Sequence, residues 1–424
     1  MSNQVFEADL TWTGQVFEPG IQIEVSEGRI VSRGLLGLEP TSRLERQALL
    51  PGFVNAHSHA FQLGLRGRGE LFPSGSGSFW TWRQAMYDLV SSLDEQAFFD
   101  LTERAYREML AAGITTVGEF HYLHHSAEGE DFAFDDLVLS AAESAGIRLV
   151  LLNVYYRSGG IGQELADGQR RFRTADPAQY WRRMDTLGAR LRGPAQSLGA
   201  VAHSVRAATP EEIAAIHREA RRRDMPFHIH LEEQRQEIEQ CLEGYGKRPM
   251  ALLNDTLDSL EGVTAVHCTH SDPQDMARFL AGGGAVCICP LTEANLGDGL
   301  ADLEAVHRQG SICLGSDSNA RISMLEEMRW LEYGQRLRSE TRGRLADAAG
   351  RVAAELIRAA CGSGADALAL ATGRIDAGAW ADFVALDLDH PSLRGWEAST
   401  LAESALFGAP DDVICGTWVG GSKR

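Results

Sequence analysis

The feature that most constrains the fold is an alternation of short apolar segments with longer segments of helical period, which runs through residues 51–372. This is the pattern of βα units around a parallel sheet. The first strand candidate lies in the run 51–60, and seven more follow at 115–120, 148–154, 198–203, 226–231, 263–267, 285–289 and 311–315. One intervening helix has a clear start, because Thr209 can cap it and Pro210 fits its first turn. Eight units predict an α/β fold, the (β/α)8 TIM barrel.

The two ends of the chain have a different texture. Residues 1–50 alternate apolar and polar side chains, and Glu27-Gly28 divides two short strands within 21–31. Similar short segments return at 373–375, 380–387 and 413–419. We therefore expect a small β-sandwich domain built from residues 1–50 plus 373–424, and a TIM-barrel domain at 51–372.

Composition and charge exclude several classes of partner. The chain has 424 residues, of which 44% are hydrophobic, so it can bury a large core. Its net charge of −19 repels nucleic acid and anionic membranes, so the expected partner is a small molecule, and an anionic substrate needs local positive groups. No apolar run reaches the ~18 residues of a membrane span, and residues 1–7 lack signal-peptide features. We expect a cytoplasmic protein.

The cysteine content agrees with that compartment. Seven cysteines, an odd number scattered along the chain, fit reduced thiols better than a disulfide framework. Cys287 and Cys289 are a close pair within an apolar strand candidate. We interpret both as small core side chains.

Polar residues collect where the predicted strands end, which is where a TIM barrel places its catalytic groups. His57 and His59 end the first strand, and their i, i+2 spacing sends both imidazoles to one face. His230 ends the fifth strand and Asp317 follows the eighth. Three imidazoles and one carboxylate suit a borderline divalent ion such as zinc. The sequence therefore predicts a metal that ionises water near neutral pH.

Other ionisable residues near these strand ends leave alternatives open. Glu232 and Glu233 follow the fifth strand, and each is a candidate proton carrier. His267 and His270 follow the sixth strand in the same way, whereas His228 is expected deeper in the core. A further group of histidines is expected in loops or on helix surfaces, namely His121, His124, His125, His217, His307 and His390.

Four motifs carry a family resemblance. The segments PGFVNAHSHA at 51–60, HIHLEE at 228–233, HCTH at 267–270 and GSDS at 315–318 together resemble the amidohydrolase superfamily over essentially the whole chain. In that superfamily, members with two metals use a carboxylated lysine at the end of strand four. This chain has only Lys247 and Lys423, and its strand four ends in the segment 201–206. The resemblance therefore implies the mononuclear deaminase subgroup, with one divalent metal per chain, zinc first and iron second.

The same resemblance implies roles for the residues at the strand ends. It makes Glu233 the proton shuttle and His267 the group that polarises the attacked centre. It makes Asp317 both a ligand and the acceptor of a second proton. The implied metal ligands are His57, His59, His230 and Asp317.

Longer segments resemble the formimidoylglutamate deiminases of histidine degradation. They lie at 59–62, 79–83, 203–206, 292–299 and 329–337. The implied activity is hydrolytic deimination of N-formimino-L-glutamate to N-formyl-L-glutamate and ammonia, and the implied quaternary state is a homodimer. The implied substrate contacts are Gln62, Arg83, Tyr122, His203 and Arg206. The two arginines suit this substrate, because a glutamate derivative carries two carboxylates and each guanidinium offers a charged fork.

Alternatives to this function are another mononuclear deaminase, acting on guanine or an adenosine derivative, and a non-catalytic scaffold. A nucleobase pocket should favour stacking aromatics and amides over paired arginines. Two segments have open roles. The run 74–78 is either a hinge over the barrel mouth or a surface excursion, and Asn319 and Arg321 are candidates for tuning substrate choice.

Overall fold

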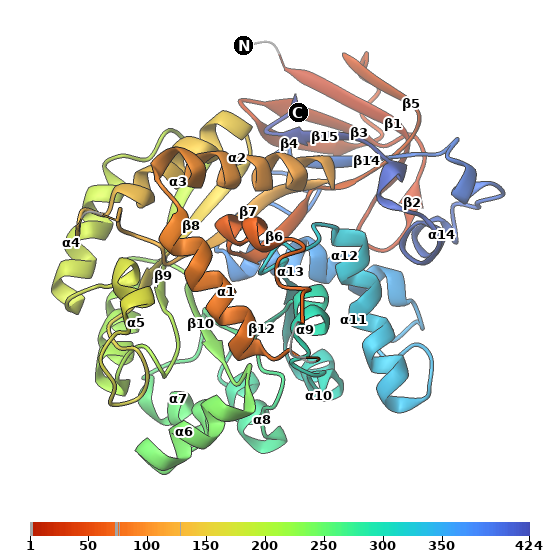
Figure 1. The fold of residues 1–424 in the computed structure, drawn as a ribbon. Helices are drawn as coiled ribbons and strands as arrows, with labels where there is room; N and C mark the ends of the chain where they lie inside the picture. Colours follow the sequence, from red (N-terminus) through yellow and green to blue (C-terminus); the bar gives the residue numbers. More distant parts are fainter. Residues whose placement is uncertain (1–2, 73–74, 76, 128) are drawn as a thin grey trace.

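A computed structural model describes residues 3–72, 75, 77–127 and 129–424. One of its two eight-stranded sheets is a parallel barrel in which each strand pairs with the next one along the chain (Figure 1). The strands are β6 (Phe53–Ser58), β7 (Ile114–His121), β8 (Arg148–Tyr155), β9 (Gln196–Ala202), β10 (Phe227–Leu231), β11 (Val263–His267), β12 (Ala285–Ile288) and β13 (Ser311–Leu314). The predicted barrel and all eight of its strands are confirmed.

The barrel closes between its first and last strands at the predicted metal residues. Ser58 and Asp317 form a parallel bridge there. The backbone N–H of His59 donates to the Asp317 carbonyl at 2.9 Å, and the N–H of Ser316 donates to the His57 carbonyl at 3.0 Å. Because of this closure, groups some 260 residues apart in sequence become direct neighbours.

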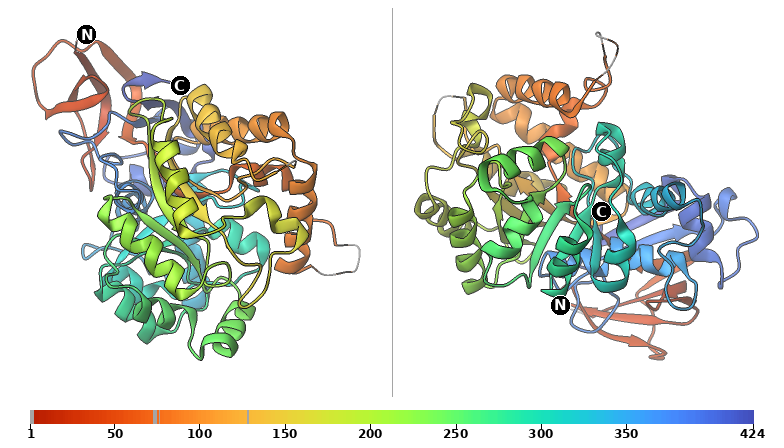
Figure 2. Two further views of the ribbon diagram at one scale, coloured as in Figure 1. Left: turned by 90° about the vertical axis from the view of Figure 1, so that its left-hand side faces the viewer. Right: turned by 90° about the horizontal axis from the view of Figure 1, so that it is seen from below.

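Helices surround the barrel (Figures 1 and 2). In chain order they are α1 (Phe79–Ser92), α2 (Glu95–Ala111), α3 (Ala133–Ala145), α4 (Pro177–Gly188), α5 (Pro210–Arg222), α6 (Arg235–Tyr245), α7 (Pro249–Thr256), α8 (Pro273–Ala281), α9 (Pro290–Leu296), α10 (Leu303–Gln309), α11 (Met324–Ser339), α12 (Val352–Ala360), α13 (Gly362–Ala367) and α14 (Leu401–Gly408). Thr209 caps α5 and forms a capping box with Glu212, which confirms the helix start expected there. In the described parts of the chain, no helix combines the length and apolarity needed to cross a membrane.

A second sheet joins the two ends of the chain, as predicted. Its strands are β1 (Gln4–Trp12), β2 (Phe17–Glu18), β3 (Gln22–Ser26), β4 (Arg29–Gly34), β5 (Ser42–Pro51), β14 (Phe383–Asp387), β15 (Ile414–Val419) and β16 (Ser422–Lys423). The ends meet where β14 pairs antiparallel with β5, and both termini lie on this side of the barrel (Figure 2). The segment 373–375 is not in a strand, although Ile375 packs into the sheet's core. The domain limits given above stay a prediction.

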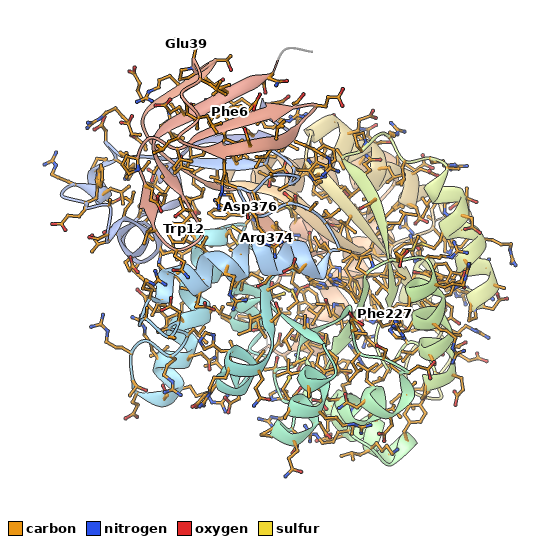
Figure 3. All side chains as sticks on the ribbon, turned by 180° about the vertical axis from the view of Figure 1, so that it is seen from behind. Phe6, Trp12, Glu39, Phe227, Arg374 and Asp376 are labelled. Carbon is orange, nitrogen blue, oxygen red and sulfur yellow. The ribbon has the colours of Figure 1, made fainter. Side chains whose placement is uncertain are left out.

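The second sheet has its own apolar core and a buried polar link to the barrel. In that core the Phe6 ring contacts those of Phe383 and Trp418, and Figure 3 shows Phe6 in this sheet and Phe227 in the barrel. Arg148 of β8 donates two hydrogen bonds, of 2.8 and 3.0 Å, to the Asp382 carboxylate just before β14. Both side chains are buried, so this pair fixes the sheet against the barrel.

The paired cysteines lie inside the barrel. Cys287 and Cys289 pack with Cys313, Ala56 and Val266 in a small buried cluster. Their interpretation as core residues is confirmed.

Candidate active site

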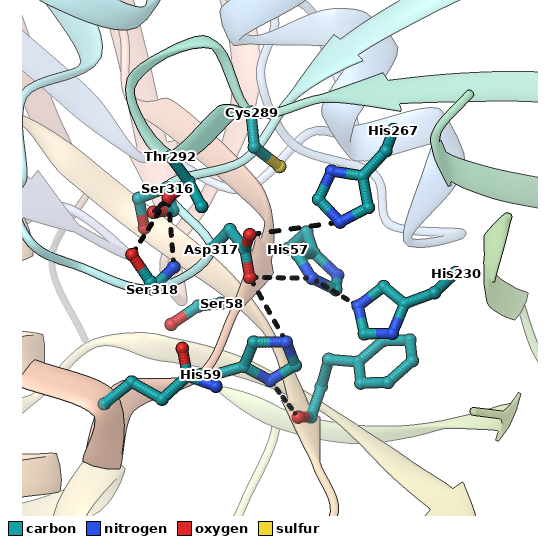
Figure 4. Close-up of polar contacts among 12 residues, drawn as sticks. His57, Ser58, His59, His230, His267, Cys289, Thr292, Ser316, Asp317 and Ser318 are labelled. Atoms are coloured by element: carbon teal, nitrogen blue, oxygen red, sulfur yellow. Dashed lines mark hydrogen bonds and ion pairs between the residues drawn. The ribbon is translucent and has the colours of Figure 1, made fainter. Parts of the chain in front are cut away.

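Four side chains from three barrel strand ends converge on one point (Figure 4). His57 and His59 belong to β6 and the turn after it, His230 to β10, and Asp317 to the loop after β13. His57 Nε2 lies 3.1 Å from His230 Nε2 and 3.4 Å from Asp317 Oδ1, and His59 Nε2 lies 3.2 Å from the same oxygen. All four residues are buried.

The protonation of these groups favours metal binding. Burial lowers the pKa of His57 to about 4 and that of His59 to about 3, so both rings are neutral at pH 7. Burial opposes ionisation of Asp317, yet contacts with His57 and His59 hold its pKa below the usual value. His59 Nδ1 donates to the Phe120 carbonyl at 2.8 Å, which leaves its Nε2 lone pair directed at the cluster.

The donor set fits a divalent metal. Tetrahedral zinc with bonds of 2.0–2.1 Å to nitrogen places its ligand atoms about 3.3–3.4 Å apart. The three distances above, 3.1, 3.2 and 3.4 Å, lie close to that value. The neutral imidazole nitrogens carry lone pairs that face one another and the carboxylate. A divalent cation shared by these groups satisfies the lone pairs, which would otherwise need protons. His57, His59, His230 and Asp317 would hold this ion.

The backbone around the cluster is strained. Asp317, His267 and Glu232 have φ values of 46°, 75° and 53°, in the left-handed region that non-glycine residues avoid. Such conformations cost about 1–3 kcal/mol each and concentrate at functional sites. Asn319, also left-handed, holds the strained loop: its side chain donates to Ser58 Oγ and to the Asp317 carbonyl, both at 3.1 Å.

The two predicted proton-handling residues lie in one cavity beside the cluster. Glu233 and His267 both line it. Burial raises the pKa of Glu233, and His267 and Arg206 oppose that rise. Burial also opposes charge on His267, yet Glu233, Glu293 and Asp317 together raise its pKa to about 10.

The structure distinguishes Glu233 and His267 from Glu232 and His270, the other candidates for these two roles. The Glu232 side chain accepts from the Met250 N–H at 3.2 Å and faces Arg248, away from the cavity. Neither Glu232 nor His270 lines the cavity. His228 lies in the core as expected, with Nε2 2.8 Å from the Ala367 carbonyl oxygen.

All five predicted substrate contacts line the same cavity, namely Gln62, Arg83, Tyr122, His203 and Arg206. Gln62 donates to the Tyr122 hydroxyl at 2.7 Å, so these two side chains orient each other. Arg83 on α1 donates from Nε to the Tyr87 hydroxyl at 2.5 Å. Arg206 is buried, with its guanidinium 3.9 Å from Glu233. His57 lies beneath the cavity wall and does not line it.

The structure adds supporting residues that the sequence analysis missed. Glu293 lies 3.3 Å from His267 Nδ1, and Glu119 accepts from the Ala60 N–H at 2.7 Å. Tyr87 holds Arg83, and Glu237 faces Arg206 at 3.8 Å. Glu119 lies near the end of the predicted strand 115–120 and Glu293 lies in the segment 292–299, so both positions could have been singled out from the sequence. Tyr87 and Glu237 lie on helices, where the sequence offers none.

Asn319 and Arg321 do not line the cavity: Asn319 supports the Asp317 loop, and Arg321 faces Glu326 and Asp411. Of the run 74–78, Ser74 and Ser76 lie outside the described residues, so its role as a hinge stays open.

Of the histidines expected in loops or on helix surfaces, His124 and His125 lie in the loop after β7, although both are buried. The expectation is wrong for His121, which ends β7, and for His217, which is buried on α5. His121 Nε2 and His124 Nδ1 lie 3.0 and 2.8 Å from Asp135 Oδ1. Arg183 donates to the other carboxylate oxygen at 2.8 Å, so the group forms a satisfied buried network. Sequence periodicity does not reveal such polar partners. His307 and His390 are partly exposed.

Comparison with known proteins adds independent findings. The profile of the amidohydrolase family matches residues 48–423. A formimidoylglutamate deiminase of Pseudomonas aeruginosa is 40% identical over 385 residues, covering 88% of this chain and 84% of the relative. The crystal structure of an amidohydrolase from Brucella melitensis has a TM-score of 0.89 and 34% identity, covering 99% of this chain and 94% of the other. An adenosine deaminase from Xanthomonas campestris, solved with bound zinc, shares the fold at a TM-score of 0.82 and 24% identity, with 99% and 92% covered.

Proposed function

Because the chain belongs to the amidohydrolase family, we propose that its site hydrolyses N-formimino-L-glutamate to N-formyl-L-glutamate and ammonia. The observation that carries the proposal is one cavity in which two arginines, Arg83 and Arg206, face the buried His and Asp cluster. The similar deiminase of Pseudomonas aeruginosa supports it over most of both chains.

The cavity suits a small dianion with an amidine at one end. Among the described residues, the Arg206 guanidinium forms no hydrogen bond. Its two ion-pair contacts, with Glu237 at 3.8 Å and Glu233 at 3.9 Å, are too long for one, so its N–H groups remain available to a substrate carboxylate. Arg83 uses Nε on Tyr87 and keeps its terminal nitrogens for a second carboxylate. A purine offers no carboxylate to either arginine, which disfavours guanine and adenosine derivatives.

The first chemical step adds water to the formimino carbon. When bound by the four ligand residues, a divalent ion supplies Lewis acidity and lowers the pKa of water. Glu233 takes a proton from the attacking water and passes it to the terminal imine nitrogen, so a C–O bond forms as the C=N π bond breaks. His267, oriented by Glu293, donates a hydrogen bond toward the attacked centre.

The second step releases ammonia. The tetrahedral adduct carries a hydroxyl group, an amino group and the glutamate nitrogen on one carbon. The hydroxyl proton moves through Asp317 Oδ2 and the again ionised Glu233 to the amino group, and the C–N bond to ammonia breaks as the formyl C=O forms, so both carboxylates end ionised. Burial supports both transfers, because it raises the pKa of Glu233 toward that of its partners.

The identity of the metal, the cellular compartment and the quaternary state expected from the sequence are proposals. Zinc is the proposed ion, supported by the three imidazoles and single carboxylate of the cluster. Iron suits the same ligands. A cytoplasmic homodimer is proposed as before.

The direct test is ammonia release by the metal-loaded protein from formiminoglutamate, guanine and an adenosine derivative, measured side by side. We expect turnover of formiminoglutamate, with the other two at least 100-fold slower in kcat/KM. Preferred turnover of a purine would overturn the proposal.

A further inference from the structure

A buried glutamate, Glu237, lies behind the arginine that faces the substrate cavity. It is on the first turn of α6, which follows the β10 loop that carries Glu233. Its side chain is fully buried, and it does not line the cavity. Glu237 is therefore placed to act on substrate only through Arg206.

Arg206 is held between two carboxylates without being hydrogen-bonded by either. Its Nη2 atom lies 3.9 Å from Glu233 Oε2, and its Nε atom lies 3.8 Å from Glu237 Oε2. Arg206 Nε and both Glu237 oxygens have no partner at full hydrogen-bond geometry among the described residues, although the Glu232 backbone N–H lowers the pKa of Glu237. Buried polar atoms without partners are costly, so each such group needs an explanation.

We infer that Glu237 is the exchangeable counter-ion of Arg206: it neutralises the guanidinium in the free enzyme and takes up a proton from solvent when a substrate carboxylate binds there. The inference rests on the proposed function, because it requires that Arg206 receives a carboxylate. Arg206 stays charged throughout, the incoming carboxylate replaces Glu237 as its partner, and one proton on Glu237 balances the added negative charge.

The charge balance of the site requires some such compensation. Without it, a bound carboxylate would be the third negative group around a single buried guanidinium. Like charges so close in a low-dielectric environment cannot all stay ionised. Among the three, the substrate carboxylate gains hydrogen bonds from Arg206, and Glu233 must be ionised to accept the water proton. Glu237 has neither constraint.

The groups that face Glu237 include one cation and two other carboxylates. They are Arg206 from the loop after β9, Glu232 and Glu233 from the loop after β10, Cys241 from α6 itself and Cys268 from the loop after β11. Arg206 is the only cation in this set. Burial raises the pKa of Glu237 to about 7, with Arg206 lowering it and the two neighbouring glutamates raising it. The proton is therefore exchanged near physiological pH.

The inference has a definite pH signature. Glu237 is ionised in the free enzyme above about pH 7 and protonated in the complex, so binding consumes a proton there. Each pH unit above that value should raise the KM for formiminoglutamate about tenfold, with little change in kcat. Below about pH 7 the KM should not depend on this group.

The test is calorimetric titration of the metal-loaded protein with N-formyl-L-glutamate at pH 7.5, in buffers of different ionisation enthalpy. The wild type should take up about three-quarters of a proton per site, the ionised fraction expected at that pH. Glu237→Gln should abolish most of the uptake, flatten the KM profile and bind more tightly than the wild type at pH 8.5. Glu239→Gln, on the exposed face of the same helix, should behave as the wild type.

The outcomes separate this inference from the proposed function. Binding by the wild type without proton uptake overturns the role of Glu237, and this measurement needs no variant. Unchanged proton uptake in Glu237→Gln overturns it as well. A KM that this variant raises equally at every pH also overturns it, because that result indicates a merely structural role for Glu237. Absence of ammonia release from formiminoglutamate overturns the proposed function itself.

Discussion

Replacing Arg206 with methionine tests the substrate assignment most informatively. Methionine keeps an apolar stem of similar length and removes the guanidinium. In the structure that guanidinium is buried, and its contacts with Glu233 and Glu237 are 3.8 Å or longer, so a substrate carboxylate can occupy two of its donors. Each charge-assisted hydrogen bond is worth about 1.5–3 kcal/mol.

The lower end of that range gives about 3 kcal/mol for two bonds, or at least about a 100-fold fall in kcat/KM. Most of the fall should appear as a higher KM, because Arg206 contacts the substrate away from the reacting carbon. Arg206→Lys keeps the charge without the fork and should lie between the two proteins.

The assay is steady-state ammonia release over a range of formiminoglutamate concentrations. Arg218→Met is the matched control, since Arg218 on α5 is mostly exposed and should leave both parameters unchanged. Circular dichroism checks that each variant is folded. A loss of less than tenfold in Arg206→Met would refute the assignment of this arginine to a substrate carboxylate.

Four further changes test other parts of the account. Glu233→Gln should lower kcat by about 10²–10⁴-fold while metal analysis still finds one ion per chain; retained activity would remove its role as proton shuttle. Chelation should abolish activity and lower the melting temperature, and added zinc should restore both; a fully active apoprotein would contradict the metal site. Thr209→Ala should cost about 1 kcal/mol in urea unfolding through loss of the α5 cap, and an unchanged midpoint would deny the cap its importance. Burial lowers the pKa of His217 to about 4, so between pH 6.5 and 4 this imidazole binds more protons in the unfolded chain than in the folded protein. The free energy of unfolding should therefore decrease as the pH is lowered through this range. His217→Phe should be less acid-sensitive than the wild type by urea midpoints at pH 7 and 5; equal sensitivity would contradict this.

The barrel could be predicted from the sequence because its strands are buried on both faces. Segments such as 148–154 and 263–267 are mostly apolar, and helical segments separate them, so length and composition define each strand. The polar residues that follow these strands then meet at one end of the barrel by topology alone. This is why His57, His59, His230 and Asp317 could be grouped without coordinates.

Other parts of the site depend on which way a side chain points. Glu232 and Glu233 are adjacent in sequence, and only the left-handed backbone of Glu232 and its bond to the Met250 N–H show that it turns away from the cavity. The burial of His121 and His124 could not be predicted, because their shared partner Asp135 lies on α3 and is itself bonded by Arg183 of α4. The role of Glu237 could not be predicted either. Its position in the sequence of α6 carries no motif, and only the structure shows that Arg206 approaches it.

Which carbon–nitrogen bond breaks is the central chemical claim. The formimino carbon has two such bonds, and Glu233 delivers its proton to the terminal nitrogen. Proton and carbon NMR of a reaction that is followed to completion identifies the products directly. We predict N-formyl-L-glutamate and ammonia in equal amounts. Accumulation of L-glutamate and formamide would show that the inner bond is cleaved and would contradict the assigned geometry of Glu233.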